Sequence, residues 1–344
     1  MARQVGVSQA AVSYAYNRPE KVSAEQRERI FAVAEELGYA GPNPAGRALR
    51  TGKVGALGLV LTDSLSYAFH DPGAASLMRG ISEVGELAQV ALTLLPAPLA
   101  TVPEAAADTS LALVDGFLIY ALPDAHPMVN LVLKRGLPVV AIDGPQLPGH
   151  SFVGIDDHSA ARSAAEHLLT LGHRDVGILA SRLSADGRTG EVSAARISRA
   201  KDRVLKARVR GYLEPFGEAL RAAPAVYEAG GFDYEKSRAA AEALLDARHV
   251  TAVLAATDVM ALAVLDAARD RGIRVPEQLS VIGFDDIPAA AAADLTTIRQ
   301  SQVAKGAHAA RLLLEAVSAP AQAATVTLPT DLVVRGSTAP PPPN

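Results

Sequence analysis

The most constraining feature of the sequence is the alternation of short apolar runs with longer helical segments from residue 54 onward. A first series predicts strands at 56–62, 91–95, 116–120 and 138–142, and helices at 74–88 and 128–135. A second series predicts strands at 152–155, 176–180, 225–228, 252–255 and 280–284, and helices at 159–171, 200–220, 234–248 and 259–271. Short apolar runs separated by helical patterns are typical of buried parallel strands. We therefore expect an α/β fold with two repeats of a parallel sandwich, arranged as a two-lobed clamp.

A shorter helical segment precedes this region. Residues 6–17 read GVSQAAVSYAYN and predict a short helix with Ser8 as its N-cap and a polar free face. Residues 23–36 predict a second helix with Ser23 as its N-cap, and residues 1–4 supply about one turn of a further, truncated helix. Taken alone, residues 6–17 also fit an ordinary surface helix whose polar face is solvated.

A proline-containing linker follows, and residues 45–50 after it predict six residues of helix. Six residues of helix do not persist alone in water, and Gly46 weakens them further. This segment therefore needs a partner, and DNA is one candidate.

Composition and charge limit the class of protein. An apolar content of 49% over 344 residues indicates two or three globular domains, and the absence of cysteine excludes disulfides and thiolate metal sites. No apolar run is long enough to span a bilayer and residue 1 begins a polar segment, so we expect a cytoplasmic protein. Residues 1–53 hold eight Lys or Arg and five Asp or Glu, whereas the rest holds 25 basic and 32 acidic residues. A basic head on an acidic body suits a polyanionic partner for the head.

The sequence offers no support for catalysis. It contains neither a glycine-rich dinucleotide motif nor a phosphate-binding loop after the first strand, and its eight histidines show no metal-ligand spacing. We therefore expect no enzyme activity, no metal and no cofactor.

The order of the motifs resembles the lactose-repressor/galactose-repressor (LacI) family of bacterial transcription regulators. The resemblance rests on GVSQAAVSYAYN, KVSAEQRERI, ELGYAGPNPAGRALRTGK and GALGLVLT, and continues through HLLTLGHRDVGILA, AATDVMALAVLDAARDRGIRVPEQLSVIGFDD and LTTIRQ. It implies a helix-turn-helix head at 1–40, a linker and hinge helix at 41–53, and a two-lobed, periplasmic-binding-protein-like domain at 54–338 for effector binding and dimerisation. Lobe one is expected at about 54–154 and 286–317, and lobe two at about 155–285 and 318–338. The proline-rich tail at 339–344 is expected to be disordered.

The resemblance also implies which residues contact DNA. Gln9, Ala10 and Tyr14 fall at base-reading positions, and Gln9 can pair with adenine through two hydrogen bonds. The remaining implied contacts, to phosphate or as framework, are Ser8, Ser13 and Asn17. In the hinge helix Leu49 is the implied minor-groove wedge and Arg50 lies near phosphate, although a linker leucine packed on the body is the alternative.

For the effector site the resemblance implies three polar and two aromatic residues, namely Asp143, Arg208, Asp258, Phe69 and Phe232. The polar groups suit sugar hydroxyls and the rings suit an apolar ligand face. Alternatives remain: Asp258 also fits a helix start, Arg208 a solvated face and Phe69 the core. The pairs Asp285-Asp286 and Gly172-His173 are interpreted as structural turns.

The expected function is that of a DNA-binding repressor switched by a small molecule, a sugar or a similar polar ligand. Its partners are operator DNA of pseudo-palindromic sequence and a second copy of the chain, in a homodimer or a tetramer. The alternative is a soluble sugar-binding protein whose truncated head no longer binds DNA.

Overall fold

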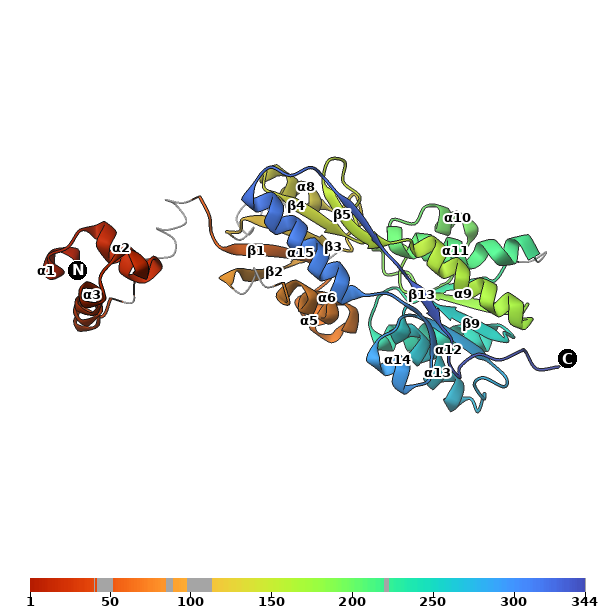
Figure 1. The fold of residues 1–344 in the computed structure, drawn as a ribbon. Coiled ribbons are helices and arrows are strands. Elements are labelled where there is room, and N and C mark those ends of the chain that lie inside the picture. The colour runs from red at the N-terminus through yellow and green to blue at the C-terminus, as the bar shows by residue number, and fades with distance from the viewer. Residues whose placement is uncertain (40, 42–51, 85–88, 98–112, 220–222, 344) are drawn as a thin grey trace. The chain divides into compact units, whose positions relative to one another are not determined.

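The computed structural model describes residues 1–39, 41, 52–84, 89–97, 113–219 and 223–343. The chain divides into a head unit at residues 1–55 and a larger unit at residues 56–344 (Figure 1). Each unit is described by itself below.

The head unit is a small bundle of helices. Its described elements are α1 (Ala2–Val5), α2 (Gln9–Asn17), the 3₁₀ turn η1 (Pro19–Lys21) and α3 (Ala24–Glu36). Ser8 Oγ accepts a hydrogen bond from Ala11 N at 3.0 Å, and Ser23 Oγ accepts one from Gln26 N at 3.2 Å. Both predicted N-caps are therefore confirmed, and each satisfies an amide at the start of its helix.

The head's core is made by few side chains, Val5, Val12, Ala15 and Ile30, with Ile30 fully buried. Arg29 on α3 adds a polar tie, because its Nη2 donates to the carbonyl oxygen of Val5 at the end of α1 at 3.3 Å. This bond satisfies one of the terminal carbonyls that a helix leaves open. The four-residue α1 is thus held by one buried valine and one capping arginine.

The larger unit contains two sheets of mainly parallel strands. We call the six-stranded sheet and its helices lobe one; its order is β12 (Thr325–Leu328), β5 (Ser151–Ile155), β4 (Val139–Ile142), β3 (Gly116–Tyr120), β1 (Ala56–Thr62) and β2 (Ala91–Ala97). We call the seven-stranded sheet and its helices lobe two; its order is β13 (Asp331–Val333), β11 (Thr296–Arg299), β10 (Ser280–Asp285), β9 (Ala252–Ala255), β6 (Val176–Ala180), β8 (Ala225–Glu228) and β7 (Gly190–Glu191). Two α/β lobes are the predicted fold class, and this prediction is confirmed.

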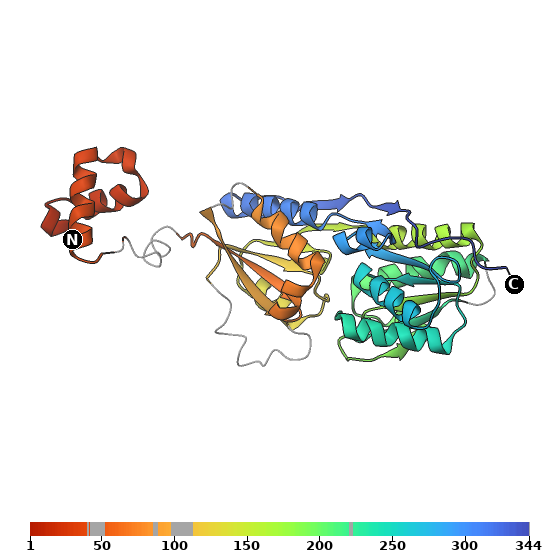
Figure 2. The same ribbon diagram turned by 90° about the horizontal axis from the view of Figure 1, so that it is seen from below.

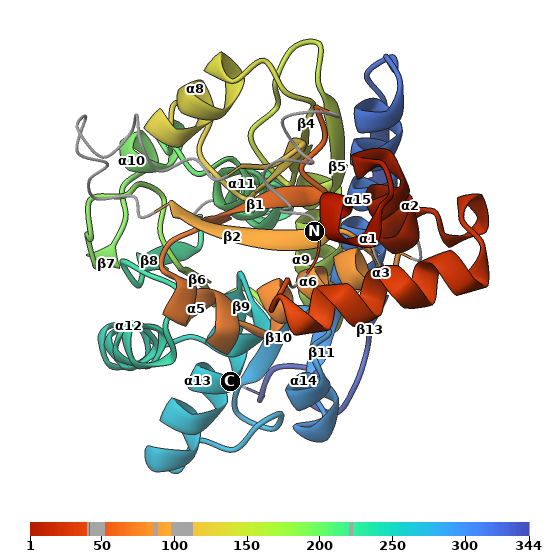
Figure 3. The same ribbon diagram turned by 90° about the vertical axis from the view of Figure 1, so that its left-hand side faces the viewer.

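Helices flank both sheets. Lobe one carries α5 (Leu65–His70), α6 (Pro72–Ser82), α8 (Pro127–Lys134) and α15 (Gln302–Ser318). Lobe two carries α9 (Asp157–Leu171), α10 (Ala194–Ser198), α11 (Arg203–Ala219), α12 (Tyr234–Ala247), α13 (Asp258–Asp270) and α14 (Pro288–Ala292). In lobe one α6 and α15 pack against each other (Figure 3). Their backbones approach so closely that a Cβ atom on Gly80 would overlap the carbonyl of Val303, which explains the glycine at this point.

The chain crosses between the lobes three times, and every crossing lies within the described residues. The crossings join β5 to α9, β11 to α15, and β12 to β13 (Figure 2). The last crossing is the long blue strand segment that runs along both lobes in Figure 1. These connections form the hinge region of the clamp.

The expected lobe boundaries are wrong in two places. Residues 286–299 were assigned to lobe one, but the short α14 returns the chain beside β10, so β11 pairs in parallel with β10 in lobe two. Residues 318–338 were assigned to lobe two, but β12 pairs in parallel with β5 and extends the sheet of lobe one. The strand at 152–155 was grouped with the second series, but it lies in lobe one, in agreement with the expected bound of about 154. Short strands carry no pattern that specifies their neighbour, so their sheet is set by tertiary pairing.

Several element boundaries also differ. The helix expected at 200–220 is α11, which begins at Arg203 and ends at Ala219, and the short α10 before it was not expected. The helix expected at 74–88 begins at Pro72 and ends at Ser82. The expected hinge helix at 45–50 lies outside the described residues. None of the described helices is long and apolar enough to cross a membrane.

The C-terminal tail is not free along its whole length, contrary to the expectation for 339–344. His173 Nε2 donates to the carbonyl oxygen of Ala339 at 2.9 Å, and Ala339 N donates to Ser280 Oγ at 3.1 Å. His173 is fully buried, and burial lowers its pKa, so its neutral form fits this site. Prolines prevent regular structure here but not packing, because the two bonds use the backbone of Ala339.

The packing of the head predicts that Ile30→Ala unfolds it selectively. Removing this buried side chain from so small a core costs about 2–5 kcal/mol, which is a large part of the stability of a small domain. Hydrogen–deuterium exchange of peptides from residues 1–39 is expected to accelerate, with no change in β9 or β10. Glu28→Ala, at an exposed position on the same helix, is the control. Unchanged exchange in Ile30→Ala would contradict the assigned core.

Candidate functional site

A cleft opens between the carboxyl ends of the strands of the two lobes. Its outer cavity, of about 630 Å³, is lined by Asp63, Ser64, Ser66, Tyr67, His70, Asp71 and Pro72 from lobe one and by Arg182, Gly230, Gly231, Phe232, Asp233, Tyr234, Lys236 and Val259 from lobe two. A smaller inner chamber of about 80 Å³ shares Tyr67, Asp71 and Phe232 with it. Ligands of open α/β sheets bind at the carboxyl ends of strands, so this cleft is the candidate effector site.

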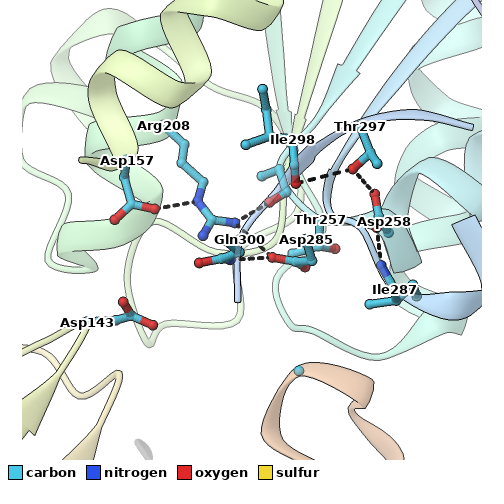
Figure 4. Close-up of polar contacts among 12 residues, drawn as sticks. Asp143, Asp157, Arg208, Thr257, Asp258, Asp285, Ile287, Thr297, Ile298 and Gln300 are labelled. Carbon is cyan, nitrogen blue, oxygen red and sulfur yellow. Dashed lines mark hydrogen bonds and ion pairs between the residues drawn. The ribbon is translucent and has the colours of Figure 1, made fainter. Parts of the chain in front are cut away.

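Arg208 on α11 reaches into the inner chamber, as predicted (Figure 4). Its Nε donates to Asp157 Oδ1 at 2.8 Å, its Nη1 donates to the carbonyl oxygen of Ala256 at 2.7 Å, and its guanidinium lies 3.6 Å from the ring centroid of Phe284. Burial disfavours the charged form of Arg208 and lowers its pKa, but the negative charges of Asp157 and Asp285 have a larger effect and raise the pKa of Arg208. The alternative of a solvated face is wrong, because Arg208 is buried.

Asp285, which was interpreted as a turn residue, also lines the inner chamber. It ends β10, accepts a hydrogen bond from Gln300 Nε2 at 2.5 Å, and lies 3.8 Å from Arg208 Nη1. Burial raises the pKa of Asp285 to about 7, although Arg208 acts in the opposite direction. Its neighbour Asp286 is structural as expected, since it pairs with Arg299 at 2.7 Å and with Arg335 at 2.6 Å.

Asp143 follows β4 and faces the inner chamber from lobe one, as predicted. Its Oδ1 accepts a hydrogen bond from Lys305 Nζ on α15 at 2.5 Å. Lys305 also donates to Gln300 Oε1 at 2.5 Å, and Gln300 in turn bonds Asp285. A continuous polar chain therefore links lobe one to lobe two at the back of the cleft.

The two predicted aromatic residues have different environments. Phe232 lines both the outer cavity and the inner chamber, and its ring centroid lies 5.5 Å from that of Tyr67. Phe69 on α5 is 64% exposed and lies outside the lining of both spaces. The prediction that Phe69 stacks on the ligand is therefore not supported, and neither is its alternative as a core residue. Tyr67, two positions earlier on the same helix, faces the cleft in its place.

Asp258 has a structural position, with its carboxylate bonded to Ile287 and Thr297 (Figure 4), and it lines neither the outer cavity nor the inner chamber. Thr257 Oγ1 caps α13 by accepting a hydrogen bond from Met260 N, while the Asp258 carboxylate accepts from Ile287 N at 2.9 Å and Thr297 Oγ1 at 2.5 Å. Burial raises the pKa of Asp258 to about 6. The carboxylate thus ties the first turn of α13 to β11 and to the segment after β10. The predicted effector contact of Asp258 is corrected on this ground.

The sequence interpretation missed Arg182 and Tyr67, which line the cleft, and Lys305, which holds Asp143 from behind it. Arg182 follows β6 by two positions and Tyr67 follows β1 by five, so the rule that ligands lie beyond strand ends would have found both. Lys305 could have been found in a different way, because it is a charged residue on the apolar side of a predicted helix. A lysine at such a position is buried only when it is paired.

The candidate DNA surface is the outer face of α2. Ser8, Gln9 and Ala10 are exposed, and Tyr14 is 37% exposed with Lys21 Nζ 5.4 Å from its ring centroid. Ser13 is half-buried on the same helix. The side chain of Asn17, and all of Leu49 and Arg50, lie outside the described residues. Lys21 is an additional basic group that the sequence interpretation did not assign to this surface.

Comparison with known proteins decides the family. The model for bacterial regulatory proteins of the lacI family matches residues 1–43, and the model for the periplasmic-binding-protein-like domain matches residues 165–338. An HTH-type transcriptional regulator of Mycobacterium tuberculosis is 39% identical over 99% of this chain and 96% of its own length. The chain belongs to the LacI family.

Solved structures of the family agree. A LacI-family transcriptional regulator from Corynebacterium glutamicum superposes with a TM-score of 0.76 at 33% identity, over 98% of this chain and 97% of that chain. The regulator CelR in complex with cellobiose superposes with a TM-score of 0.69 at 27% identity, over 98% of both chains. This LacI-family chain is therefore a DNA-binding transcriptional regulator with a helix-turn-helix head and a periplasmic-binding-protein-like domain. Its relatives are named as regulators and not as enzymes.

The raised pKa of Asp285 predicts a pH-dependent stability that Asp285→Asn removes. The folded state holds this proton up to about pH 7, whereas an unfolded aspartate loses it near pH 4, so the stability contribution is lost as pH rises through 7. Asn stays neutral and can still accept from Gln300. Between pH 5 and pH 8, the free energy of unfolding in urea should fall further in the wild type than in Asp285→Asn, by on the order of 2 kcal/mol.

Asp331→Asn, at an exposed position on β13, is the control for this comparison and should follow the wild type. Parallel pH profiles for the wild type and Asp285→Asn would show that Asp285 is ionised throughout this range.

Proposed function

We propose that this regulator is a repressor that binds a pseudo-palindromic operator as a homodimer and is switched by a small polar molecule, in the first instance a sugar. The observation that carries the proposal is the polar and aromatic cleft between two lobes on the same chain as a head with an exposed recognition helix. The regulator acts on DNA and so works in the cytoplasm.

The chemistry of the cleft supports a sugar. The carboxyl oxygens of Asp143 and Asp285 can accept hydrogen bonds from hydroxyls, and the guanidinium of Arg208 can donate to ring and hydroxyl oxygens. Phe232 and Tyr67 supply apolar ring faces beside these groups. The similar regulator CelR was solved with cellobiose. A neutral polyol meets both donors and acceptors here without leaving a charge unpaired.

The head supports readout in the major groove. Gln9, Ala10 and Tyr14 would face base edges from α2, with Ser8, Ser13 and Asn17 as phosphate or framework contacts. Leu49 and Arg50 would follow as the minor-groove wedge and its phosphate contact. Two-fold symmetry of a dimer would be matched by two half-sites in the operator.

Ligand binding in the cleft would change the relation of the lobes and so the spacing of the two heads. A coupling free energy of about 1–3 kcal/mol is enough for a switch of this kind.

The competing function is a small-molecule binding protein with a non-functional head. Duplex selection by the full chain from a random-sequence pool distinguishes the two, since only a DNA reader enriches a two-fold symmetric motif.

Replacing Gln9 tests the recognition helix. Gln9→Ala removes the side chain that can bond adenine twice, so binding to the selected duplex should weaken by about 5- to 150-fold while binding to a scrambled duplex stays the same. Fluorescence anisotropy at two salt concentrations measures both affinities. Gln26→Ala on α3 is the matched control. Equal weakening on both duplexes would assign Gln9 to non-specific contact instead.

A matched pair of phenylalanines tests the ligand site. Phe232→Leu removes the ring that lines the cleft, so affinity for the bound sugar should fall by about 3- to 15-fold, whereas the exposed Phe69→Leu should bind normally. Isothermal titration with a panel of mono- and disaccharides that includes cellobiose measures this difference. Operator affinity without sugar should be the same in both variants. Equal sugar affinities would remove Phe232 from the site.

A further inference from the structure

Arg182 bridges the two lobes at the outer cavity. It follows β6 in lobe two, yet its Nη1 donates to Asp63 Oδ2 at 3.2 Å and its Nη2 donates to Thr62 Oγ1 at 2.9 Å, and both acceptors belong to lobe one. The residue is only 6% exposed. Hydrogen bonds from a buried guanidinium to a carboxylate and a hydroxyl are charge-assisted and therefore among the stronger contacts that a cleft can hold.

Stacking on an aromatic ring fixes the orientation of the Arg182 guanidinium. Its guanidinium carbon lies 4.2 Å from the ring centroid of Phe232, and Phe232 packs at 5.5 Å against Tyr67 of lobe one. The order Arg182, Phe232, Tyr67 is thus a stack that begins in lobe two and ends in lobe one. A planar cation on an aromatic face is oriented as well as attracted.

Asp63, which accepts the hydrogen bond from Arg182, lies in the short connection between β1 and α5 of lobe one. Asp63 follows β1 with a left-handed φ of 69°, and its second carboxylate oxygen, Oδ1, accepts a hydrogen bond from Ser64 N at 2.9 Å. Ser64 Oγ in turn caps α5 by accepting from Tyr67 N at 3.2 Å. Arg182 is therefore connected to the start of the helix that carries Tyr67.

A second contact between the lobes has a different character. Arg203 Nη2 donates to Gln146 Oε1 at 2.7 Å, and Arg203 Nη1 lies 3.9 Å from Asp124 Oδ2. Its side chain is 46% exposed, and exposed pairs of this kind contribute little to stability. Arg203 and Arg182 are the same residue type, and both reach across the cleft, but only Arg182 is buried.

We propose that Arg182 is a positioning residue of the ligand site, which holds the lobes closed at the outer cavity and keeps the ring of Phe232 against Tyr67. The proposal deepens the proposed ligand response and rests on it, because a ligand that fills the outer cavity lies against Arg182 and Asp63, the two ends of this bridge. Burial lowers the pKa of Arg182, although Asp202 and Asp63 act in the opposite direction. A guanidinium has five N–H donors, so the two bonds to Asp63 and Thr62 leave donors that a ligand hydroxyl in the outer cavity would accept from.

The distance between the lobes tests the proposal without DNA or ligand. The chain has no cysteine, so Asn130→Cys on α8 and Ala239→Cys on α12 place one spin label on an exposed position of each lobe. Double electron–electron resonance on the full chain, diluted with excess unlabelled chain, then reports the distance within one copy. In Arg182→Ala the ratio of open to closed lobes should rise by about tenfold, because a charge-assisted bond is lost. Arg182→Lys should give an intermediate ratio.

Arg203→Ala in the same labelled background is the matched control and should give the wild-type distribution. A distribution for Arg182→Ala that equals the wild type, or equals that of Arg203→Ala, would overturn the proposal. If Arg182→Ala does not fold, Asp63→Asn takes its place, since Asn tolerates a positive φ and can still accept from Ser64 N. An unchanged distance in Asp63→Asn would count equally against the bridge. None of these outcomes depends on operator binding, so they leave the proposed function to its own test.

Discussion

The larger unit depends on the burial of one ammonium group, that of Lys305. No part of this residue is exposed, and its Nζ lies between Asp143 of lobe one and Gln300, which begins the crossing from lobe two. An unpaired charge in such a place is very unfavourable, so Asp143 and Gln300 must stay where they are while α15 stays packed. The crossing from β11 to α15 is therefore specified by a polar contact, and the apolar cores of the two lobes lie to either side.

The polar chain at the hinge also shapes the cleft beside it. Asp285 joins this chain through Gln300 and reaches Arg208, which is itself held by Asp157. The carboxyl groups of Asp143 and Asp285 therefore both hold the two lobes together and line the space that a ligand would occupy. A ligand that bonds one of them necessarily changes the electrostatic balance of the hinge, which is the kind of differential contact that allows a small molecule to shift a conformational equilibrium.

The sequence predicted what periodicity and local capping determine. The two α/β lobes and the caps at Ser8 and Ser23 followed from patterns within single elements, whereas the inward position of Arg208 was implied by the family resemblance. The sheet that each short strand joins did not, because β11 and β12 are placed by pairing partners far away in the chain. The roles of Phe69 and Asp258 were wrong for a related reason: which face of a helix or loop meets the cleft is decided by packing that the sequence does not display.

The three crossings have a consequence for how such a regulator can be taken apart. Lobe one is assembled from 56–155, from α15 and from β12, while lobe two takes the residues between and after them. Neither lobe corresponds to one uninterrupted stretch of coding sequence. No single cut in the gene can therefore yield an intact lobe, and a proteolytic nick within either lobe leaves fragments that remain interleaved. Each lobe can therefore form only when the chain segments of the other lobe are present in the same gene product.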